Sequence, residues 1–140
     1  MIKCYLSLGS NKGNRTRYLR KAIDLIRTKF EILNISPVYE TEPYAVSSQN
    51  WFLNIVICIK TNISAENILK IVKTIENKIG KAKQYSDGSR NIDIDILFYG
   101  NKVINKKNLI IPHPRLDKRK FVLQPLIDIG ARKFVHPILN

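Results

Sequence analysis

Three stretches of the chain are predicted to be β-strands, two because apolar residues alternate with other residues at a period of two, and one because it is apolar on both faces apart from Asn54. These stretches are residues 2–8, 51–60 and 92–98. A fourth, residues 32–40, is rich in β-branched and aromatic residues but contains Pro37, which predicts an edge strand or a bulge. We therefore expect four strands, with the segment 9–14 forming a turn after the first of them.

Two further stretches repeat their apolar residues every three or four positions, the period of an amphipathic helix. The first covers residues 15–29 and the second begins after Ser64, a good N-cap, and ends at Gly80. After residue 98, Gly100-Asn101 predicts a hairpin into residues 102–104, and a helical stretch follows around 121–127.

The order strand, helix, strand, strand, helix, strand predicts an α+β fold with a ferredoxin-like βαββαβ core. We expect an antiparallel sheet covered by helices, extended at the C-terminal side by the hairpin and helix. The length of 140 residues, with 44% hydrophobic residues, fits a single domain over residues 1–140.

Composition narrows the classes of function. The longest apolar runs are too short for a membrane span, so we expect no membrane association and a cytoplasmic protein. Cys4 and Cys58 lie in apolar strands and have no second pair, which predicts two buried free thiols. The net charge of +13 indicates an anionic partner, either a nucleic acid or nucleotide phosphates.

Asp93 and Asp95 carry the most specific chemistry in the sequence. They alternate with Ile92, Ile94 and Ile96, so both carboxylates lie on one strand face, about 6.6 Å apart along the strand, while the isoleucines face the core. Two such carboxylates suit Mg²⁺ bound together with a phosphorylated substrate. The alternative is a solvated acidic face, but aspartate is a poor strand former and calls for a further reason.

Other polar residues surround this pair in the expected fold. Lys81, Lys83 and Arg90 precede the acids and could neutralise phosphate, although solvated loop lysines are the alternative. His113 lies between two prolines and is either a ligand-facing or merely an exposed imidazole. Asn54 stands on an otherwise apolar face, where its carboxamide can bind a heteroaromatic edge or satisfy nearby backbone groups.

Several ordered motifs resemble 6-hydroxymethyl-7,8-dihydropterin pyrophosphokinases, and the resemblance covers nearly the whole chain. The motifs are Gly9-Ser10-Asn11, Tyr39-x-Thr41-x-Pro43, Phe52-Leu53-Asn54, Arg90-x-x-Asp93-x-Asp95, Pro112-His113-Pro114-Arg115 and Arg119-x-Phe121. The resemblance implies an ATP-dependent diphosphokinase of folate biosynthesis, a transferase that moves pyrophosphate from ATP to the hydroxymethyl group of the pterin and releases AMP.

The resemblance also implies a role for individual residues. Asp93 and Asp95 would hold two Mg²⁺ ions and act, with Arg90, as the catalytic residues. Residues expected to contact ATP are Glu76, Lys81, Lys83, Arg90, His113 and Arg119. Residues expected to frame the pterin are Thr41, Pro43, Tyr44, Phe52, Asn54 and Phe121. Lys81 and Lys83 stand where the family often has arginines, which keeps the charge but loses the bidentate fork.

The competing hypothesis is a ferredoxin-like domain that binds single-stranded RNA across its sheet. Against it, nothing in the sequence resembles an RNP1 pattern, and two carboxylates on the open face would repel a phosphate backbone. A ligand sensor without turnover on the same scaffold is a third possibility. We expect small-molecule substrates, no nucleic acid, and a monomer.

Overall fold

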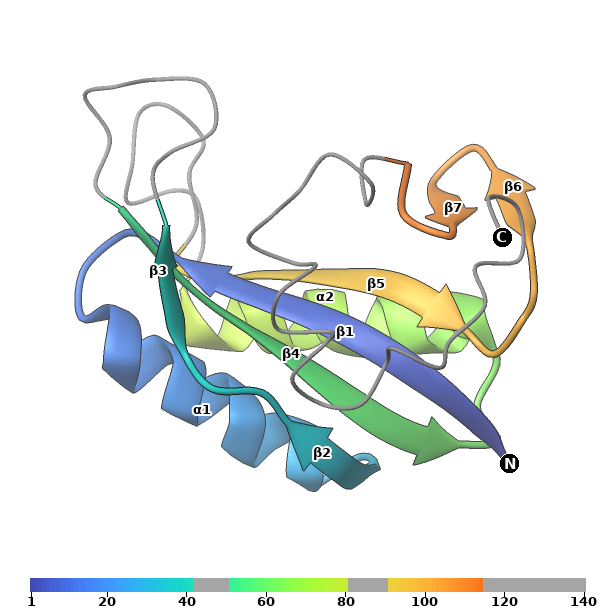
Figure 1. Cartoon of the computed structure of the whole chain (residues 1–140), viewed down its shortest axis with the longest axis horizontal. Helices are drawn as coiled ribbons and strands as arrows, with labels where there is room; N and C mark the ends of the chain where they lie inside the picture. Colours follow the sequence, from blue (N-terminus) through green and yellow to red (C-terminus); the bar gives the residue numbers. More distant parts are fainter. Residues whose placement is uncertain (42–50, 81–90, 115–140) are drawn as a thin grey trace.

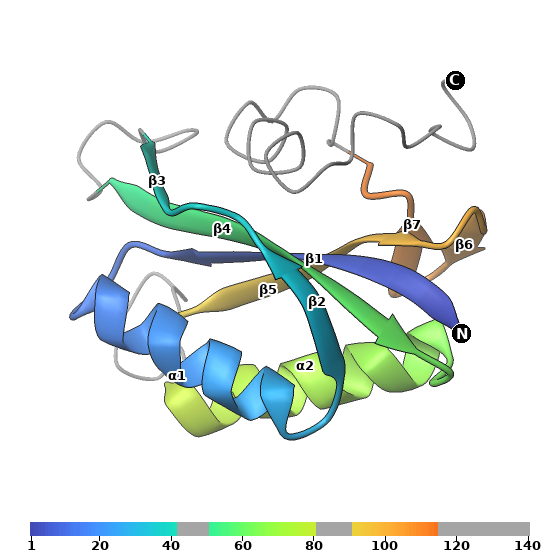
Figure 2. The same cartoon turned by 60° about the horizontal axis from the view of Figure 1, so that its bottom comes forward.

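The computed structural model describes residues 1–41, 51–80 and 91–114, and within them one antiparallel sheet carries two helices on a single face. In Figure 2 both helices lie on the same side of the sheet. The sheet contains β1 (Ile2–Ser10), β2 (Glu31–Ile35), β3 (Tyr39–Thr41), β4 (Phe52–Thr61) and β5 (Asp93–Tyr99). Their order is β2-β4-β1-β5, and β3 also pairs with β4. The predicted antiparallel sheet with covering helices is confirmed.

The alternation read from the sequence sets the two faces of this sheet. Leu6, Leu8, Ile57 and Ile94 are buried in the core beneath the helices. The intervening residues of β1, β4 and β5 face the other side, where Asn54, Asp93 and Asp95 were expected. The two free thiols, at Cys4 and Cys58, are buried as predicted.

Both helices begin where a side chain caps them. In α1 (Arg15–Arg27), the Asn14 side chain accepts a hydrogen bond from the Arg17 N–H, 3.1 Å away. In α2 (Ala65–Ile79), the predicted cap Ser64 accepts from the Asn67 N–H at 3.2 Å, and the helix ends at Gly80. Their apolar faces pack on the sheet, so helix length and orientation follow from the 3.6-residue period.

Pro37 interrupts the strand predicted over residues 32–40, as expected. β2 and β3 lie on either side of it, and both pair with β4. Ser36 keeps the connection in place, since its N–H donates to the Val56 carbonyl and its hydroxyl accepts from the Val56 N–H, each at 2.9 Å. The break leaves β3 free to carry Thr41 toward Asn54.

Two details of the sequence prediction were wrong. Gly9 and Ser10 belong to β1 instead of a turn, because they continue the pairing with β4, Ser10 opposite Leu53. The chain turns after Tyr99, but residues 102–104 form no hairpin with β5. Instead β6 (Ile104–Lys106) pairs with β7 (Leu109–Ile111) in a separate two-stranded sheet, visible beside the end of β5 in Figure 1.

Two contacts on the outer edge of β5 explain why, among the described strands, only β1 pairs with it. The Ile94 N–H on that edge donates to the Glu76 side chain at 2.7 Å. The Leu97 carbonyl accepts from the His113 N–H at 3.1 Å. Side chain and backbone from elsewhere therefore occupy the edge. The expected helix around 121–127 lies outside the described residues, and no helix within them is long and apolar enough to cross a membrane.

Candidate active site

One row of residues, at the end of β1, crosses the sheet face opposite α1 and α2, which we call the open face although Val56 and Cys58 on it are buried. Gly9 pairs with Asn54 of β4 on one side and with Asp93 of β5 on the other, and Tyr39 of β3 pairs with Asn54. Because neighbouring strands lie about 4.8 Å apart, the backbones at Asn54 and Asp93 are about 10 Å apart. Gly9 contributes no side chain between them, so the row carries a polar side chain on each side of a glycine.

Asp93 and Asp95 lie on the same face of β5, as the alternation predicted. Asp93 is exposed and Asp95 is half-buried, while Ile92, Ile94 and Ile96 are buried on the opposite face. Within the described residues no three His, Cys, Asp or Glu side chains gather at one point, so this part of the chain offers a pair of carboxylates and not a closed cage. Two accessible carboxylates suit Mg²⁺, which keeps several waters and shares its ligands with substrate phosphates.

Asn54 has a fixed orientation on the other side of Gly9. Its side chain is buried, and its Nδ2 donates to the Thr41 hydroxyl of β3 at 2.7 Å. A Cβ atom added at Gly9 would lie only 2.9 Å from the Asn54 Oδ1 and 3.6 Å from the Phe52 ring. The carboxamide oxygen therefore lies over Gly9, and Thr41, Phe52 and Asn54, for which the resemblance implies contact with the pterin, form one group.

A pocket of about 310 Å³ opens beside Asp95 at the outer edge of β5. Its polar groups include Asp95, Lys73 of α2, Lys107 and His113, and its apolar wall includes Ile96 and Ile110. The hydrogen bond from the His113 backbone to Leu97 holds the imidazole next to this strand. A pocket with an apolar wall, two lysines and the Asp95 carboxylate suits a nucleotide better than a neutral ligand.

Glu76 of α2 is placed behind this pocket. The residue is only 1% exposed, and its Oε2 accepts the hydrogen bond from the Ile94 N–H. Its Oε1 lies 3.2 Å from the Lys73 ammonium. The carboxylate therefore contacts the strand between the two aspartates and one of the lysines that line the pocket.

Comparisons with known proteins agree with this arrangement. The model of the 7,8-dihydro-6-hydroxymethylpterin-pyrophosphokinase (HPPK) family matches residues 5–131. The chain belongs to this family. Curated relatives include the 2-amino-4-hydroxy-6-hydroxymethyldihydropteridine pyrophosphokinases of Aquifex aeolicus, 41% identical over 99% of this chain and 86% of that protein, and of Bacillus subtilis, 39% identical over 89% and 76%.

Other relatives are longer proteins. The chain is 43% identical to the folic acid synthesis protein fol1 of Pneumocystis carinii over 96% of its own length, but spans only 18% of that protein. A solved HPPK-DHPS structure from Plasmodium falciparum, with pteroate, shares the fold with a TM-score of 0.82 at 18% identity, covering 99% of this chain and 42% of that one. The pyrophosphokinases of Aquifex aeolicus and Bacillus subtilis are matched over most of their length, so the family assignment does not depend on the longer proteins.

Some of the expected site residues of this HPPK family member lie outside the described residues. They are Pro43, Tyr44, Lys81, Lys83, Arg90, Arg119 and Phe121. The structure brings together the remaining ones in two groups. Thr41, Phe52 and Asn54 form the first group. In the second, Asp95 and His113 line the pocket, Glu76 holds the adjacent Ile94 N–H, and Asp93 lies two residues before Asp95 on the same face of β5.

Sequence reasoning missed three contributors to the site. Lys73 and Lys107 line the pocket, and the signal for Lys73 was its position three residues before Glu76 on the same helix. Arg15 donates to the Glu40 carboxylate at 2.9 Å and to the Trp51 carbonyl at 2.8 Å, which holds the ends of β3 and β4 together beside Thr41. No local pattern identifies a residue whose partners are this distant in sequence.

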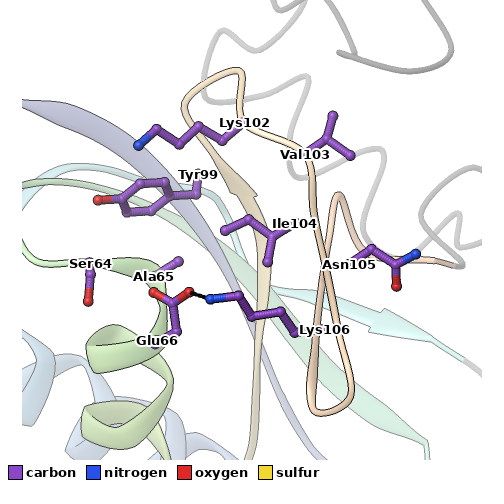
Figure 3. A pocket seen from close by; sticks show the side chains of 9 residues that line it. All are labelled: Ser64, Ala65, Glu66, Tyr99, Lys102, Val103, Ile104, Asn105 and Lys106. Carbon is purple, nitrogen blue, oxygen red and sulfur yellow. Dashed lines mark hydrogen bonds and ion pairs between the residues drawn. The ribbon is translucent and has the colours of Figure 1, made fainter.

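A second pocket, of about 350 Å³, lies at the other end of β5 (Figure 3). It is lined by Tyr99, Lys102 and residues of the β6–β7 hairpin, and the Glu66 carboxylate pairs with the Lys106 ammonium inside it. Tyr99 follows Asp93 by six positions, about 20 Å along the strand. This pocket is therefore separate from the aspartates.

Proposed function

We propose that the protein transfers the pyrophosphoryl group of ATP to the hydroxymethyl oxygen of 6-hydroxymethyl-7,8-dihydropterin and releases AMP, and that the reaction takes place on the open face of the sheet. The observation that carries the proposal is the row Asn54, Gly9 and Asp93. It places a group able to recognise a heteroaromatic edge two strands, or about 10 Å, from a pair of carboxylates suited to Mg²⁺. Family membership supplies the reaction that such a pair of subsites serves.

The pterin lies at Asn54 in this proposal. With one amide hydrogen donated to Thr41, Asn54 keeps a carbonyl oxygen and a second hydrogen, which complement the mixed donors and acceptors of a pterin edge. Phe52 offers an apolar surface beside the ring. This orientation directs the hydroxymethyl group across Gly9 toward β5.

ATP occupies the pocket beside Asp95. Lys73, Lys107 and His113 contribute cationic or hydrogen-bonding groups, while Ile96 and Ile110 give the base an apolar wall. Asp93 and Asp95 would hold two Mg²⁺ ions, which when bound neutralise phosphate charge and polarise the transferred group. The hydroxymethyl oxygen forms a bond to the β-phosphorus, the bond from that phosphorus to the α-phosphate oxygen breaks, and the hydroxyl proton is lost to solvent. Positioning contributes most, since phosphoryl transfer needs little covalent help from the protein.

The resemblance extends the same proposal to residues outside the described ranges. Arg90, Lys81, Lys83 and Arg119 would add positive charge at the phosphates, and Pro43, Tyr44 and Phe121 would complete the pterin subsite. We also assign the order β2-β4-β1-β5 to a ferredoxin-like core, in a single-domain, monomeric, cytoplasmic enzyme. The family match does not support the alternative of an RNA-binding domain, and the carboxylates on the open face also disfavour it.

Incubating the purified chain with ATP, Mg²⁺ and the pterin, and separating nucleotides by chromatography, tests the proposal directly. AMP should form only when all three are present. AMP formation without the pterin would indicate hydrolysis instead. Oligonucleotide binding with a steep salt dependence and no need for Mg²⁺ would favour the RNA-binding function.

A further inference from the structure

Glu76 is a buried acid in the middle of a helix, and its surroundings are unusual for a core position. Glutamate is rarely buried unless it is paired, because removing a carboxylate from water costs several kcal/mol of free energy. Its neighbours on the same helix face, Val72 and Ile75, are apolar. Core packing alone therefore gives no reason for an acid at this position.

The partner of Glu76 supplies the reason. Ile94 lies between Asp93 and Asp95, and in an antiparallel pair the backbone groups of successive residues point alternately toward and away from the neighbouring strand. The Ile94 N–H points away from β1, on the outer edge of β5, and donates to Glu76 Oε2. Without this bond the Ile94 N–H would be a buried donor with no acceptor, which destabilises the folded state.

The second oxygen of the same carboxylate contacts Lys73. This lysine is partly exposed and lines the pocket beside Asp95. Glu76 thus connects two parts of the site from behind, the backbone that carries both aspartates and a cation at the pocket wall.

We propose that Glu76 is a positioning residue, which holds β5 at Ile94 so that Asp93 and Asp95 keep the spacing needed to share metal ions, and which also orients Lys73 toward the nucleotide. This inference rests on the proposed function. It differs from the direct contact with ATP that the family resemblance implies for Glu76, because the carboxylate is buried against the strand. Outer groups that orient ligands in this way typically affect metal affinity or activity by about 10- to 100-fold.

Two substitutions separate the two contacts. Glu76→Leu fills the same space but removes both acceptors. Glu76→Gln keeps one oxygen for the Ile94 N–H and replaces the other by an amide NH₂, which cannot pair with an ammonium. On the same helix, Glu66→Gln is a matched control, since Glu66 pairs with Lys106 in the separate pocket of Figure 3.

The first measurement is independent of turnover. In the free protein, hydrogen exchange of the Ile94 amide, followed by NMR, should accelerate by at least about tenfold in Glu76→Leu and stay near wild type in Glu76→Gln and Glu66→Gln. Mg²⁺ affinity, titrated in the presence of a non-hydrolysable ATP analogue, should fall by about 10- to 100-fold in Glu76→Leu only. In Glu76→Gln the KM for ATP should rise by about two- to fivefold while the KM for the pterin is unchanged.

Unchanged Ile94 exchange or unchanged Mg²⁺ affinity in a folded Glu76→Leu protein would overturn the inference, as would equal effects on both KM values in Glu76→Gln. Should Glu76→Leu not fold, Glu76→Asp withdraws the carboxylate from Ile94 by one carbon, and normal Mg²⁺ affinity in that variant overturns it equally. Asp95→Asn separates a failure of the proposed function from a failure of the role proposed for Glu76. Normal Mg²⁺ affinity in Asp95→Asn defeats the proposed function, whereas a loss there without one in Glu76→Leu defeats only the role of Glu76.

Discussion

At the scale of single residues, Asp95 is the most direct test of the carboxylate assignment. Asp95→Ala should abolish AMP formation, because one of the two carboxylates proposed to hold Mg²⁺ at the phosphates would be lost. The side chain is half-buried on the open face and outside the apolar core, so the melting temperature should change little. Measuring AMP release and thermal unfolding on the same sample separates the two effects. Substantial activity in a folded Asp95→Ala protein would show that the assignment is wrong.

Gly9 tests the pterin subsite proposed at Asn54, on the other side of the row that ends at Asp93. A Cβ at this position would lie 2.9 Å from Asn54 Oδ1, closer than such contacts occur, so Gly9→Ala should displace the carboxamide. We expect a rise of about tenfold or more in the KM for the pterin, since one well-placed hydrogen-bonding group contributes about 1–3 kcal/mol, with little change in the KM for ATP. Steady-state kinetics with each substrate varied in turn gives both values.

A double-mutant cycle supplies the control for Gly9. In an Asn54→Ala background the oxygen that the new methyl group would meet is absent, so adding Gly9→Ala should cost little more. Equal, additive losses in the two backgrounds would mean that Gly9 acts through something other than Asn54.

Much of the residue-scale chemistry was predictable, and the part that was not has a physical reason. The alternation around Asp93 and Asp95 fixed their face because a strand has a two-residue period. Glu76 and Lys73 could not be assigned in this way, because helix periodicity says which face a residue occupies and not which strand edge it meets. Gly9 looked like part of a turn, and only the pairing with Asn54 and Asp93 reveals it as a strand residue.

At the scale of elements, the same limit applies to β5. Its limits and buried face followed from local pattern, but its outer edge is covered by Glu76 and by the backbone of His113, both distant in sequence. The turn at Gly100-Asn101 was expected correctly, because glycine and asparagine mark turns locally. The strand that follows, β6, pairs with β7 and not with β5 as the hairpin prediction required. The sequence pattern therefore predicts where a strand lies and which face is buried better than it predicts which strand pairs with it.

Helix α2 gives a prediction at this scale, since it carries Glu76 at one end and is capped by Ser64 at the other. Ser64→Ala removes the acceptor for the Asn67 N–H and should lower the free energy of unfolding by about 1 kcal/mol. Ser64→Asp, which restores a capping oxygen, should recover most of it. Urea denaturation measures both. Activity at 25 °C should be unchanged in each variant, because the cap lies three turns from Glu76.

At the scale of the whole molecule, the two thiols connect stability with pH. Burial, and to a lesser extent the nearby Cys58, raise the pKa of Cys4 from 9.0 to about 12, and burial also raises the pKa of Cys58. In the unfolded chain both thiols ionise at their ordinary pKa. Between about pH 9 and pH 12 the unfolded state therefore binds fewer protons than the folded state, and the free energy of unfolding must fall as pH rises.

Cys4→Ala isolates this effect from the titration of the many lysines. At pH 7 the variant should be less stable than the wild type by about 1 kcal/mol or more, because a buried sulfur atom is lost from the core. Above about pH 9 the Cys4 thiol ionises in the unfolded wild-type chain, which lowers the free energy of unfolding of the wild type. The variant has no thiol at this position and lacks this effect, so the two free energies of unfolding should converge. Urea denaturation at pH 7, 9 and 10.5 measures the difference. A difference in the free energy of unfolding that stays constant from pH 7 to pH 10.5 would mean that Cys4 ionises as readily in the folded protein as in the unfolded chain. Burial would then not affect the ionisation of Cys4.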